Sequence, residues 1–116
     1  MDDKFQLFRE GTTIFNAGDP AAHAYLVQAG QVEIRAKDGT VIDTLGAGDF
    51  FGEMALVDTA PRSAQAVATA DTSCALFSRE VVEEAINRSD FLVASLIRLL
   101  ARRLRRTVQA QDKAAA

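Results

Sequence analysis

The chain has 116 residues, enough for one domain with a real hydrophobic core and too few for two. It is 48% hydrophobic and 25% charged with a net charge of −3, which excludes a chain that binds polyanions over its whole surface. No apolar run approaches the roughly 18 residues of a membrane helix, and the N-terminus MDDKFQLF lacks the pattern of a secretory signal. We expect a single cytoplasmic domain over 1–116 without a membrane segment, and Met1 suits the start of a complete chain.

Short apolar stretches separated by Gly, Asp and Asn predict strands. Residues 2–9 are expected to form a short helix. TTIF then ends at the turn NAGDP, AYLVQ meets VEIRA across Ala29-Gly30, and VEIRA meets TVIDTL across Asp38-Gly39, a tight-hairpin signal because glycine accepts positive φ. RSAQAVATA and SCALFS bring the total to seven or eight strands, with Cys74 as a buried strand residue. The prediction is a jelly-roll-like antiparallel β-roll over about 12–78.

Two C-terminal helices are expected over about 79–110, which makes the fold class α+β. Ser78 is typical of a helix N-cap, VVEEAIN follows it, and Ser89-Asp90 is a second cap. The next helix carries an apolar stripe at helical spacing and ends in a frayed QDKAAA. The stripe consists of Val93, Ile97, Leu100, Leu104 and Val108. The sequence leaves open whether this stripe docks on its own roll or on a second copy.

The stretch FFGEMALVDTAPRSAQ, residues 50–65, places an acid and a base in an otherwise apolar segment. Residues 52–57 predict one or two helical turns, whose free N–H groups favour an anion. The planar guanidinium of Arg62 can grip two phosphate oxygens, and the small residue Ala64 lets backbone approach a ligand. Glu53 can accept hydrogen bonds from a sugar. The alternative is an internal Glu53–Arg62 salt bridge, which often contributes little net stability when buried.

The motif Phe50-Phe51-Gly52-Glu53-Met54-Ala55-Leu56, followed by Pro61-Arg62-Ser63-Ala64, resembles the phosphate-binding cassette of the cyclic nucleotide-binding domain family. The resemblance extends upstream to IFNAGD and YLVQAG, at residues 14–19 and 25–30, and downstream to ARRL at 101–104. Gln65-Ala66 departs from the Thr-Val that the family often has after the cassette, which puts the nucleotide preference in doubt.

The resemblance implies the roles of individual residues. Arg62 would pair with the cyclic phosphate, assisted by Ser63 and by the N–H of Ala55, within a cassette that includes Met54 and Ala64. Glu53 and the Gly52 carbonyl would hold the ribose 2′-hydroxyl, and Ile34 and Ile42 would line the apolar wall. On the last helix, Thr107 would contact the purine and Arg103 would reach toward Glu53. Thr107 favours cyclic AMP, whereas the Ser63 hydroxyl is also compatible with cyclic GMP.

Other classes of site lack the necessary residues. His23 is the single histidine, so neither a β-roll metal site nor a Ser/His/Asp set can be assembled, and we expect no enzyme activity and no cofactor. The arginines at 102, 103, 105 and 106 are read as a solvated basic face without a nucleic-acid partner. The predicted function is a regulatory domain in which cyclic AMP, or also cyclic GMP, moves the C-terminal helices. Two alternatives stay open: a ligand-free interaction module, and the sensor fragment of a larger channel, kinase or transcription factor, with the last helix contacting an effector or a second copy.

Overall fold

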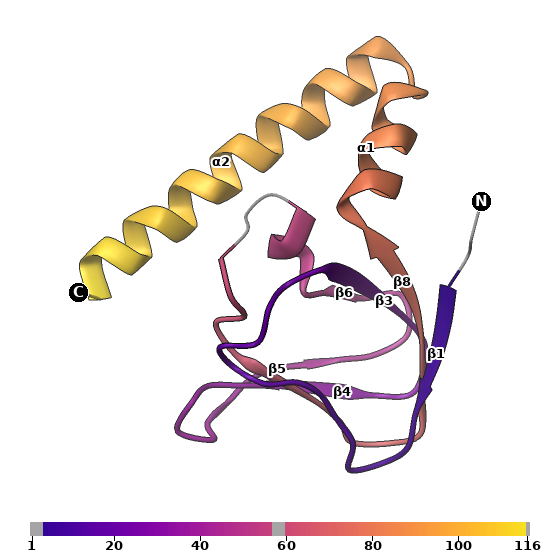
Figure 1. The fold of residues 1–116 in the computed structure, drawn as a ribbon, viewed down its shortest axis with the longest axis vertical. Helices are drawn as coiled ribbons and strands as arrows, with labels where there is room; N and C mark the ends of the chain where they lie inside the picture. The colour runs from indigo at the N-terminus through magenta and orange to yellow at the C-terminus, as the bar shows by residue number, and fades with distance from the viewer. Residues whose placement is uncertain (1–3, 57–59, 116) are drawn as a thin grey trace.

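The computed structural model describes residues 4–56 and 60–115, and at residue 105 and from 107 onward it describes only the backbone. Within this part of the chain, two four-stranded antiparallel sheets are followed by two helices (Figure 1). The strand orders are β1-β8-β3-β6 and β2-β7-β4-β5. The elements are β1 (Lys4–Phe8), β2 (Thr13–Phe15), β3 (His23–Ala29), β4 (Val32–Arg35), β5 (Val41–Leu45), β6 (Phe50–Phe51), the short 3-10 helix η1 (Glu53–Leu56), β7 (Gln65–Ala68), β8 (Thr72–Ser78), α1 (Arg79–Asn87) and α2 (Phe91–Ala115).

The hydrophobic core lies between the two sheets, and both sheets contribute to it. Val27 and Cys74 come from one sheet and Val32 and Ala66 from the other, and all four side chains are buried. Strands of this kind point alternate side chains to opposite faces, so one face of each sheet fills the core. Burial raises the pKa of the Cys74 thiol to about 11. The predicted antiparallel β-roll with C-terminal helices is therefore confirmed.

The predicted N-terminal helix over 2–9 is wrong, because the chain forms the edge strand β1 there. Lys4–Phe8 pairs antiparallel with β8, with Phe5 opposite Ala75 and Phe8 opposite Thr72. Phe8 is buried in the core, whereas Phe5 and Leu7 are 58% and 80% exposed on the outer side. The edge of β8 offers unpaired backbone groups, and pairing with them satisfies the backbone of this segment, whose polar and apolar residues alternate as in a strand.

The turn at Ala29-Gly30 does not close a hairpin between β3 and β4, as the sequence had suggested. β3 pairs with β6 and β8, whereas β4 pairs with β5 and β7 in the other sheet. Gly30 has a φ of +105°, and a Cβ there would lie 2.5 Å from the Asp71 carbonyl oxygen and against Thr72 Oγ1. Glycine is needed at this corner because the chain crosses between the sheets against the β7–β8 turn. The predicted hairpin at Asp38-Gly39 does join β4 and β5.

Side-chain caps start both helices where the sequence predicts them. Ser78 Oγ accepts a hydrogen bond from Val81 N at 3.2 Å, and Asp90 Oδ1 accepts one from Leu92 N at 2.9 Å. The helix α2 continues to Ala115, past the predicted end near residue 110, so the expected frayed end is helical. Among the described residues, no helix is both long and apolar enough to cross a bilayer.

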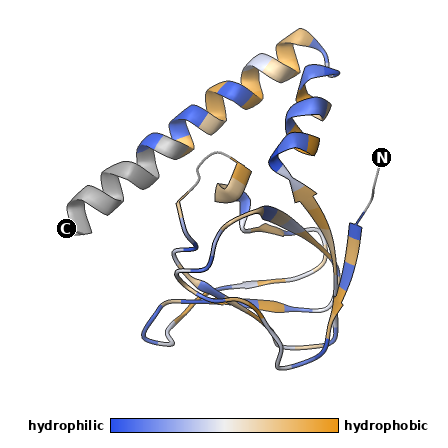
Figure 2. Ribbon diagram, viewed as in Figure 1, coloured by the Kyte–Doolittle hydropathy of each residue, from blue (hydrophilic) through white to orange (hydrophobic). Residues whose placement is uncertain are grey.

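The apolar stripe of α2 is not buried against the roll. Val93 is 47% exposed, Ile97 39%, Leu100 53% and Leu104 39%, while the side chain of Val108 lies outside the described residues. Apolar and polar residues alternate along the first half of the helix, which extends past the roll from the end of α1 (Figure 2). In this structure the two helices therefore leave the roll open on the side of η1.

Candidate functional site

A cavity of about 470 Å³ opens beside η1, between that helix, the segment before β7 and the hairpin β4–β5. It brings together residues that are distant in sequence, and two acids, Asp43 and Glu53, and one base, Arg62, are among them. Of the predicted site residues, those that line it are Ile34, Ile42, Gly52, Glu53, Met54, Ala55, Arg62, Ser63 and Ala64. The predicted cassette and the predicted apolar wall thus face one common space.

The backbone at the start of η1 is shaped by Gly52. This glycine has a φ of +67°, and a Cβ there would lie 2.7 Å from Arg62 Nη1. Its carbonyl oxygen accepts a hydrogen bond from Ala55 N at 3.2 Å, which closes the single turn of η1. Only glycine combines the left-handed conformation with this close approach. The expected short helix is therefore present, and the N–H of Ala55 already has a partner within it.

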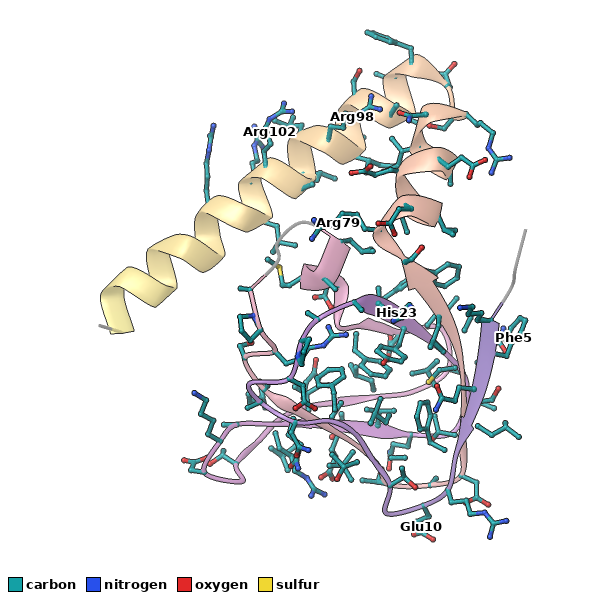
Figure 3. All side chains as sticks on the ribbon, viewed as in Figure 1. Phe5, Glu10, His23, Arg79, Arg98 and Arg102 are labelled. Atoms are coloured by element: carbon teal, nitrogen blue, oxygen red, sulfur yellow. The ribbon has the colours of Figure 1, made fainter. Side chains whose placement is uncertain are left out.

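Arg62 is buried, with 8% of its surface exposed, and its guanidinium turns inward beneath the cavity. Nη1 donates to the Gly52 carbonyl at 3.0 Å and Nη2 donates to the His23 carbonyl, on β3 (Figure 3), at 2.6 Å. Its Cζ lies 4.2 Å from the centre of the Phe15 ring. Within residues 4–56 and 60–115, Nε is a buried nitrogen without a hydrogen-bond partner. The guanidinium is thus held by neutral groups and is incompletely satisfied.

The internal salt bridge that the sequence left open does not form. The ion pairs found in the described part of the chain join Arg35 with Glu33 and Arg88 with Glu84, and Arg62 is in neither. Burial lowers the pKa of Arg62, although the neighbouring Tyr25 hydroxyl and, to a smaller extent, the carboxylates of Glu53 and Asp19 act in the opposite direction. A buried cation without a bonded carboxylate is costly, and an anion entering the cavity would reduce that cost.

Sequence reasoning missed several residues that line the cavity, and Phe15 and Asp43 are the most informative of them. Phe15 was noted only as part of a turn-forming stretch, yet its ring faces the guanidinium of Arg62. Asp43 lines the cavity from β5 beside Ile42. An acid inside the apolar strand segment VIDTL was a visible signal for Asp43. Phe15 gave no such signal, because a phenylalanine ending a strand is typical of an ordinary core residue.

Of the two contacts predicted from the last helix, the structure tests only that of Arg103, which is not brought to the cavity. Arg103 is an exposed residue of α2 and does not line the cavity, and the side chain of Thr107 lies outside the described residues. A neighbouring cavity of about 640 Å³ lies between η1, α1 and α2, and Glu53 borders it as well. Arg98 and Arg102 line it from α2, where Figure 3 labels both. Open space therefore separates the nucleotide cassette from α2.

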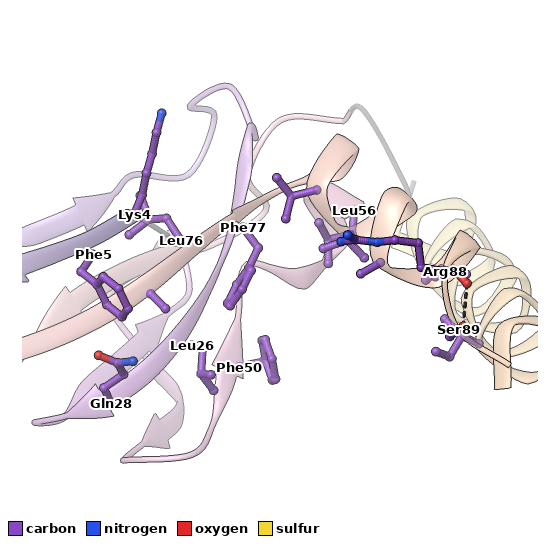
Figure 4. Close-up of a pocket in the computed structure, with 16 residues that line it drawn as sticks. Lys4, Phe5, Leu26, Gln28, Phe50, Leu56, Leu76, Phe77, Arg88 and Ser89 are labelled. Carbon is purple, nitrogen blue, oxygen red and sulfur yellow. Dashed lines mark hydrogen bonds between the residues drawn. The ribbon is translucent and has the colours of Figure 1, made fainter. Parts of the chain in front are cut away.

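A third cavity, also about 640 Å³, lies on the outer face of the β1-β8-β3-β6 sheet below α1 (Figure 4). Its lining is almost wholly apolar and includes Phe5, Leu26, Phe50 and Phe77. It lacks the convergent polar groups that orient a small ligand. Among the described residues, no group of three or more His, Cys, Asp or Glu side chains could hold a metal ion. The polar chemistry is thus concentrated around Arg62.

A β-roll with a buried, incompletely hydrogen-bonded arginine beside a one-turn helix is typical of a domain that binds a small anionic ligand. The family model described as "Cyclic nucleotide-binding domain" matches residues 5–89, and the chain belongs to this family. The chain is 34% identical to the CRP-like cAMP-activated global transcriptional regulator of Mycobacterium tuberculosis, covering 86% of this chain and 46% of that protein. It is 40% identical to the cyclic AMP receptor protein of Thermus thermophilus, with coverages of 86% and 48%. The chain thus spans about half the length of these curated relatives.

Solved structures agree with the family. The half-site-occupied form of the EAL enzyme Bd1971 matches with a TM-score of 0.85 and 35% identity, covering 91% of this chain and 98% of the compared one. Its cAMP-bound and cGMP-bound forms match with TM-scores of 0.69 and 0.71, at 34% and 35% identity, and this chain covers 30% of each. The similarity therefore extends over the roll and most of the helical region.

Proposed function

We propose that this chain is a regulatory sensor that binds cyclic AMP, and cyclic GMP more weakly, in the cavity around Arg62. The observation that carries the proposal is the buried guanidinium of Arg62, which faces a family-typical cassette without a bonded carboxylate. A cyclic phosphate supplies the missing negative charge. The relatives named for cyclic AMP and the neighbour structures named as cAMP-bound and cGMP-bound support the same ligand class.

In the bound state, Arg62 pairs with the cyclic phosphate, and the Ser63 hydroxyl and the N–H of Ala55 add further donors. Glu53 and the Gly52 carbonyl accept from the ribose 2′-hydroxyl, and Ile34 and Ile42 pack against the sugar and base. The Gly52 carbonyl now accepts from both Arg62 and Ala55. Binding therefore requires the guanidinium to exchange its backbone partners for phosphate oxygens, with Met54 and Ala64 completing the cassette.

The output is a movement of α1 and α2 toward the roll. The nucleotide favours the closed arrangement when it contacts α2 in that state and not in the open one. Thr107 would then meet the purine and Arg103 would approach Glu53. The exposed apolar row of α2 would dock on the roll, on a second copy or on an effector domain. The action on an effector belongs to a longer protein in the curated relatives, which are named as regulators.

We further propose that the domain itself catalyses no reaction, needs no cofactor beyond its nucleotide ligand and has no nucleic-acid partner of its own. It senses rather than acts, as the names of the transcriptional relatives suggest. The EAL enzyme among the neighbours shows that a similar roll can belong to an enzyme. This chain covers 30% of the cAMP-bound and cGMP-bound chains of that enzyme, so most of the enzyme lies outside the similarity. A cytoplasmic location suits such a sensor.

The test is calorimetric titration of the chain with cyclic AMP and cyclic GMP. Both nucleotides should bind, with cyclic AMP about tenfold tighter, since one net hydrogen bond is worth about 0.5–1.5 kcal/mol. Thr107→Ala should reduce this difference and leave the cyclic GMP affinity nearly unchanged. A tenfold preference for cyclic GMP would indicate that Ser63, and not Thr107, recognises the base. Absence of binding to either nucleotide would favour the ligand-free interaction module.

A further inference from the structure

The loop that joins β2 to β3 is bonded to both polar backbone groups of Arg62. Gly18 N donates to the Arg62 carbonyl at 2.8 Å, and Arg62 N donates to the Asp19 carbonyl at 2.8 Å. The segment 60–64 outside β7 has little other regular structure. These two hydrogen bonds therefore fix the position of the Arg62 backbone, from which its side chain extends.

This loop is itself held in one conformation by a small polar network. Asn16 N donates to Asp19 Oδ2 at 2.8 Å, and Asp19 N donates to the Asn16 carbonyl at 3.1 Å. Gln65 Nε2 donates to Asn16 Oδ1 at 3.0 Å. The glutamine that departs from the usual family pattern thus ties the loop to the first residue of β7. Carboxylate-closed turns of this type restrict the backbone before any ligand arrives.

Phe15, the residue that precedes this loop, supports the other end of the arginine side chain. Its ring centre lies 4.2 Å from Arg62 Cζ. The ring packs at 6.0 Å from the Tyr25 ring and 6.1 Å from the Phe51 ring, so its orientation is set by the aromatic core. A guanidinium over an aromatic face is attracted by the ring quadrupole, more strongly when water is excluded. The buried guanidinium therefore has a fixed platform.

We infer that Phe15, Asn16, Gly18, Asp19 and Gln65 form a clamp that positions Arg62 for an anionic ligand. This Arg62 clamp acts through the arginine and touches no phosphate itself. It restricts the conformations of the side chain before binding, so the nucleotide supplies less of the free energy of ordering a long, flexible residue when the guanidinium exchanges its backbone partners for phosphate oxygens. The inference rests on the proposed function, in which Arg62 receives the cyclic phosphate.

Phe15→Leu tests the clamp because it removes the ring and keeps an apolar side chain. We expect cyclic AMP to bind about tenfold more weakly, a loss between those typical of an exposed and of a fully desolvated cation–aromatic contact. Phe15→Tyr keeps the ring and should restore the affinity to within about twofold. Phe8→Leu is the matched control: Phe8 is a buried ring of the same core that contacts Tyr25 and lies outside the cavity lining. It should lower thermal stability without weakening nucleotide binding.

A double-mutant cycle separates positioning from general loosening. In an Arg62→Gln background, nuclear magnetic resonance titration with cyclic AMP should show Phe15→Leu costing less than about twofold, because its target is gone. A tenfold loss in both backgrounds would mean that Phe15 shapes the cavity independently of Arg62, and would overturn the inference. Equal affinity of Phe15→Leu and the parent would overturn it as well.

Gln65→Ala probes the loop end of the clamp. Losing one partly exposed hydrogen bond should weaken binding by about threefold. Thr69→Ala is its control, since the Thr69 hydroxyl donates to Gln31 Oε1 at 2.9 Å, at the opposite end of β7. Thr69→Ala should leave the affinity unchanged. A Gln65→Ala variant with parental affinity would remove Gln65 from the clamp.

Failure of the clamp is distinguishable from failure of the proposed function. If the parent binds cyclic AMP and Phe15→Leu binds equally well, the clamp is wrong and the function stands. If the parent binds no nucleotide, the function fails, and the free protein still tests the clamp. The Arg62 Nε–H resonance should then carry a ring-current shift that disappears in Phe15→Leu, and an unchanged resonance would refute the clamp.

Discussion

The guanidinium of Arg79 is hydrogen-bonded to the carbonyl oxygen of Ala55, through Nη2 at 2.8 Å and Nε at 3.3 Å. Arg79 is the first residue of α1 (Figure 3), and Ala55 lies in η1, whose backbone borders the cavity. A planar donor that bonds one carbonyl through two nitrogens fixes direction as well as distance. The phosphate cassette and the first C-terminal helix therefore share a direct polar link.

Replacing this link should uncouple binding from helix movement. In Arg79→Ala we expect the nucleotide-induced change in the position of α2 to shrink more than the affinity falls. The measurement is a spin-label distance between cysteines placed at Lys37, in the β4–β5 hairpin, and Arg102, on α2, both of which are exposed. Arg79→Lys keeps the charge but loses the pair of guanidinium donors, so its nucleotide-induced distance change should lie between those of the parent and of Arg79→Ala. A full distance change in Arg79→Ala at saturating nucleotide would contradict the link.

Arg62→Ala should weaken cyclic AMP binding by about 2–5 kcal/mol, the usual cost of losing one side of a desolvated charged contact. The roll should still fold, because the described residues form no ion pair with Arg62 and the hydrogen bonds that the variant loses are the two to the Gly52 and His23 carbonyls, while the desolvation cost of the cation is removed as well. Calorimetry and thermal unfolding check the two parts. Arg35→Ala is the control, since Arg35 pairs with Glu33 on the same strand, β4, and lies outside the cavity lining. Parental affinity in Arg62→Ala would remove this arginine from the phosphate site.

Glu53→Gln should weaken cyclic AMP binding less than Arg62→Ala does, because the amide oxygen still accepts a hydrogen bond from the ribose while the charge is lost. The sharper measurement uses 2′-deoxy cyclic AMP. This analogue should bind the parent much more weakly than cyclic AMP does, and the two ligands should differ little in the variant. Equal losses in both proteins would show that Glu53 does not read the 2′-hydroxyl.

The stability of the chain should fall at alkaline pH partly because of Cys74. Burial raises the pKa of its thiol from 9.0 to about 11, and burial also raises the pKa of Tyr25. Because the unfolded thiol ionises more readily, this stabilisation is fully present below pH 9 and is lost as the pH rises through about 11. Urea unfolding from about pH 8 to about pH 10.5 should show a shallower decline for Cys74→Ala than for the parent. Equal slopes would contradict this assignment.

Local sequence signals predicted the cassette well and the N-terminus poorly. The Gly52–Glu53 turn and the return of Arg62 depend on residues within a short stretch, and that stretch has its own conformational preferences. The N-terminal segment KFQLF alternates polar and apolar residues, which favours a strand, but its partner β8 lies more than half the chain length away. The helix predicted there was wrong because pairing with a distant edge decided the outcome.

The support of Arg62 was beyond sequence reasoning for a different reason. Phe15 and Gly18 contact Arg62, and Gln65 contacts Asn16, only once β2 has paired with the distant strand β7. The crossing at Gly30 was misread similarly, because a tight turn looks the same whether it joins partners in one sheet or transfers the chain to another. The direction of α2 also depends on which surface covers its apolar residues. The spacing of these residues does not identify that surface.

That exposed row gives ligand binding a heat-capacity signature. Val93 is 47% exposed, Leu96 52% and Leu100 53%, so the open arrangement keeps apolar surface of α2 hydrated. Any docking of α2, on its own roll or on a second copy, transfers this surface out of water and makes the heat-capacity change of binding negative. A nucleotide that only filled its cavity would give a smaller change. The temperature dependence of the binding enthalpy therefore reports how much of the helix is covered when the ligand is in place.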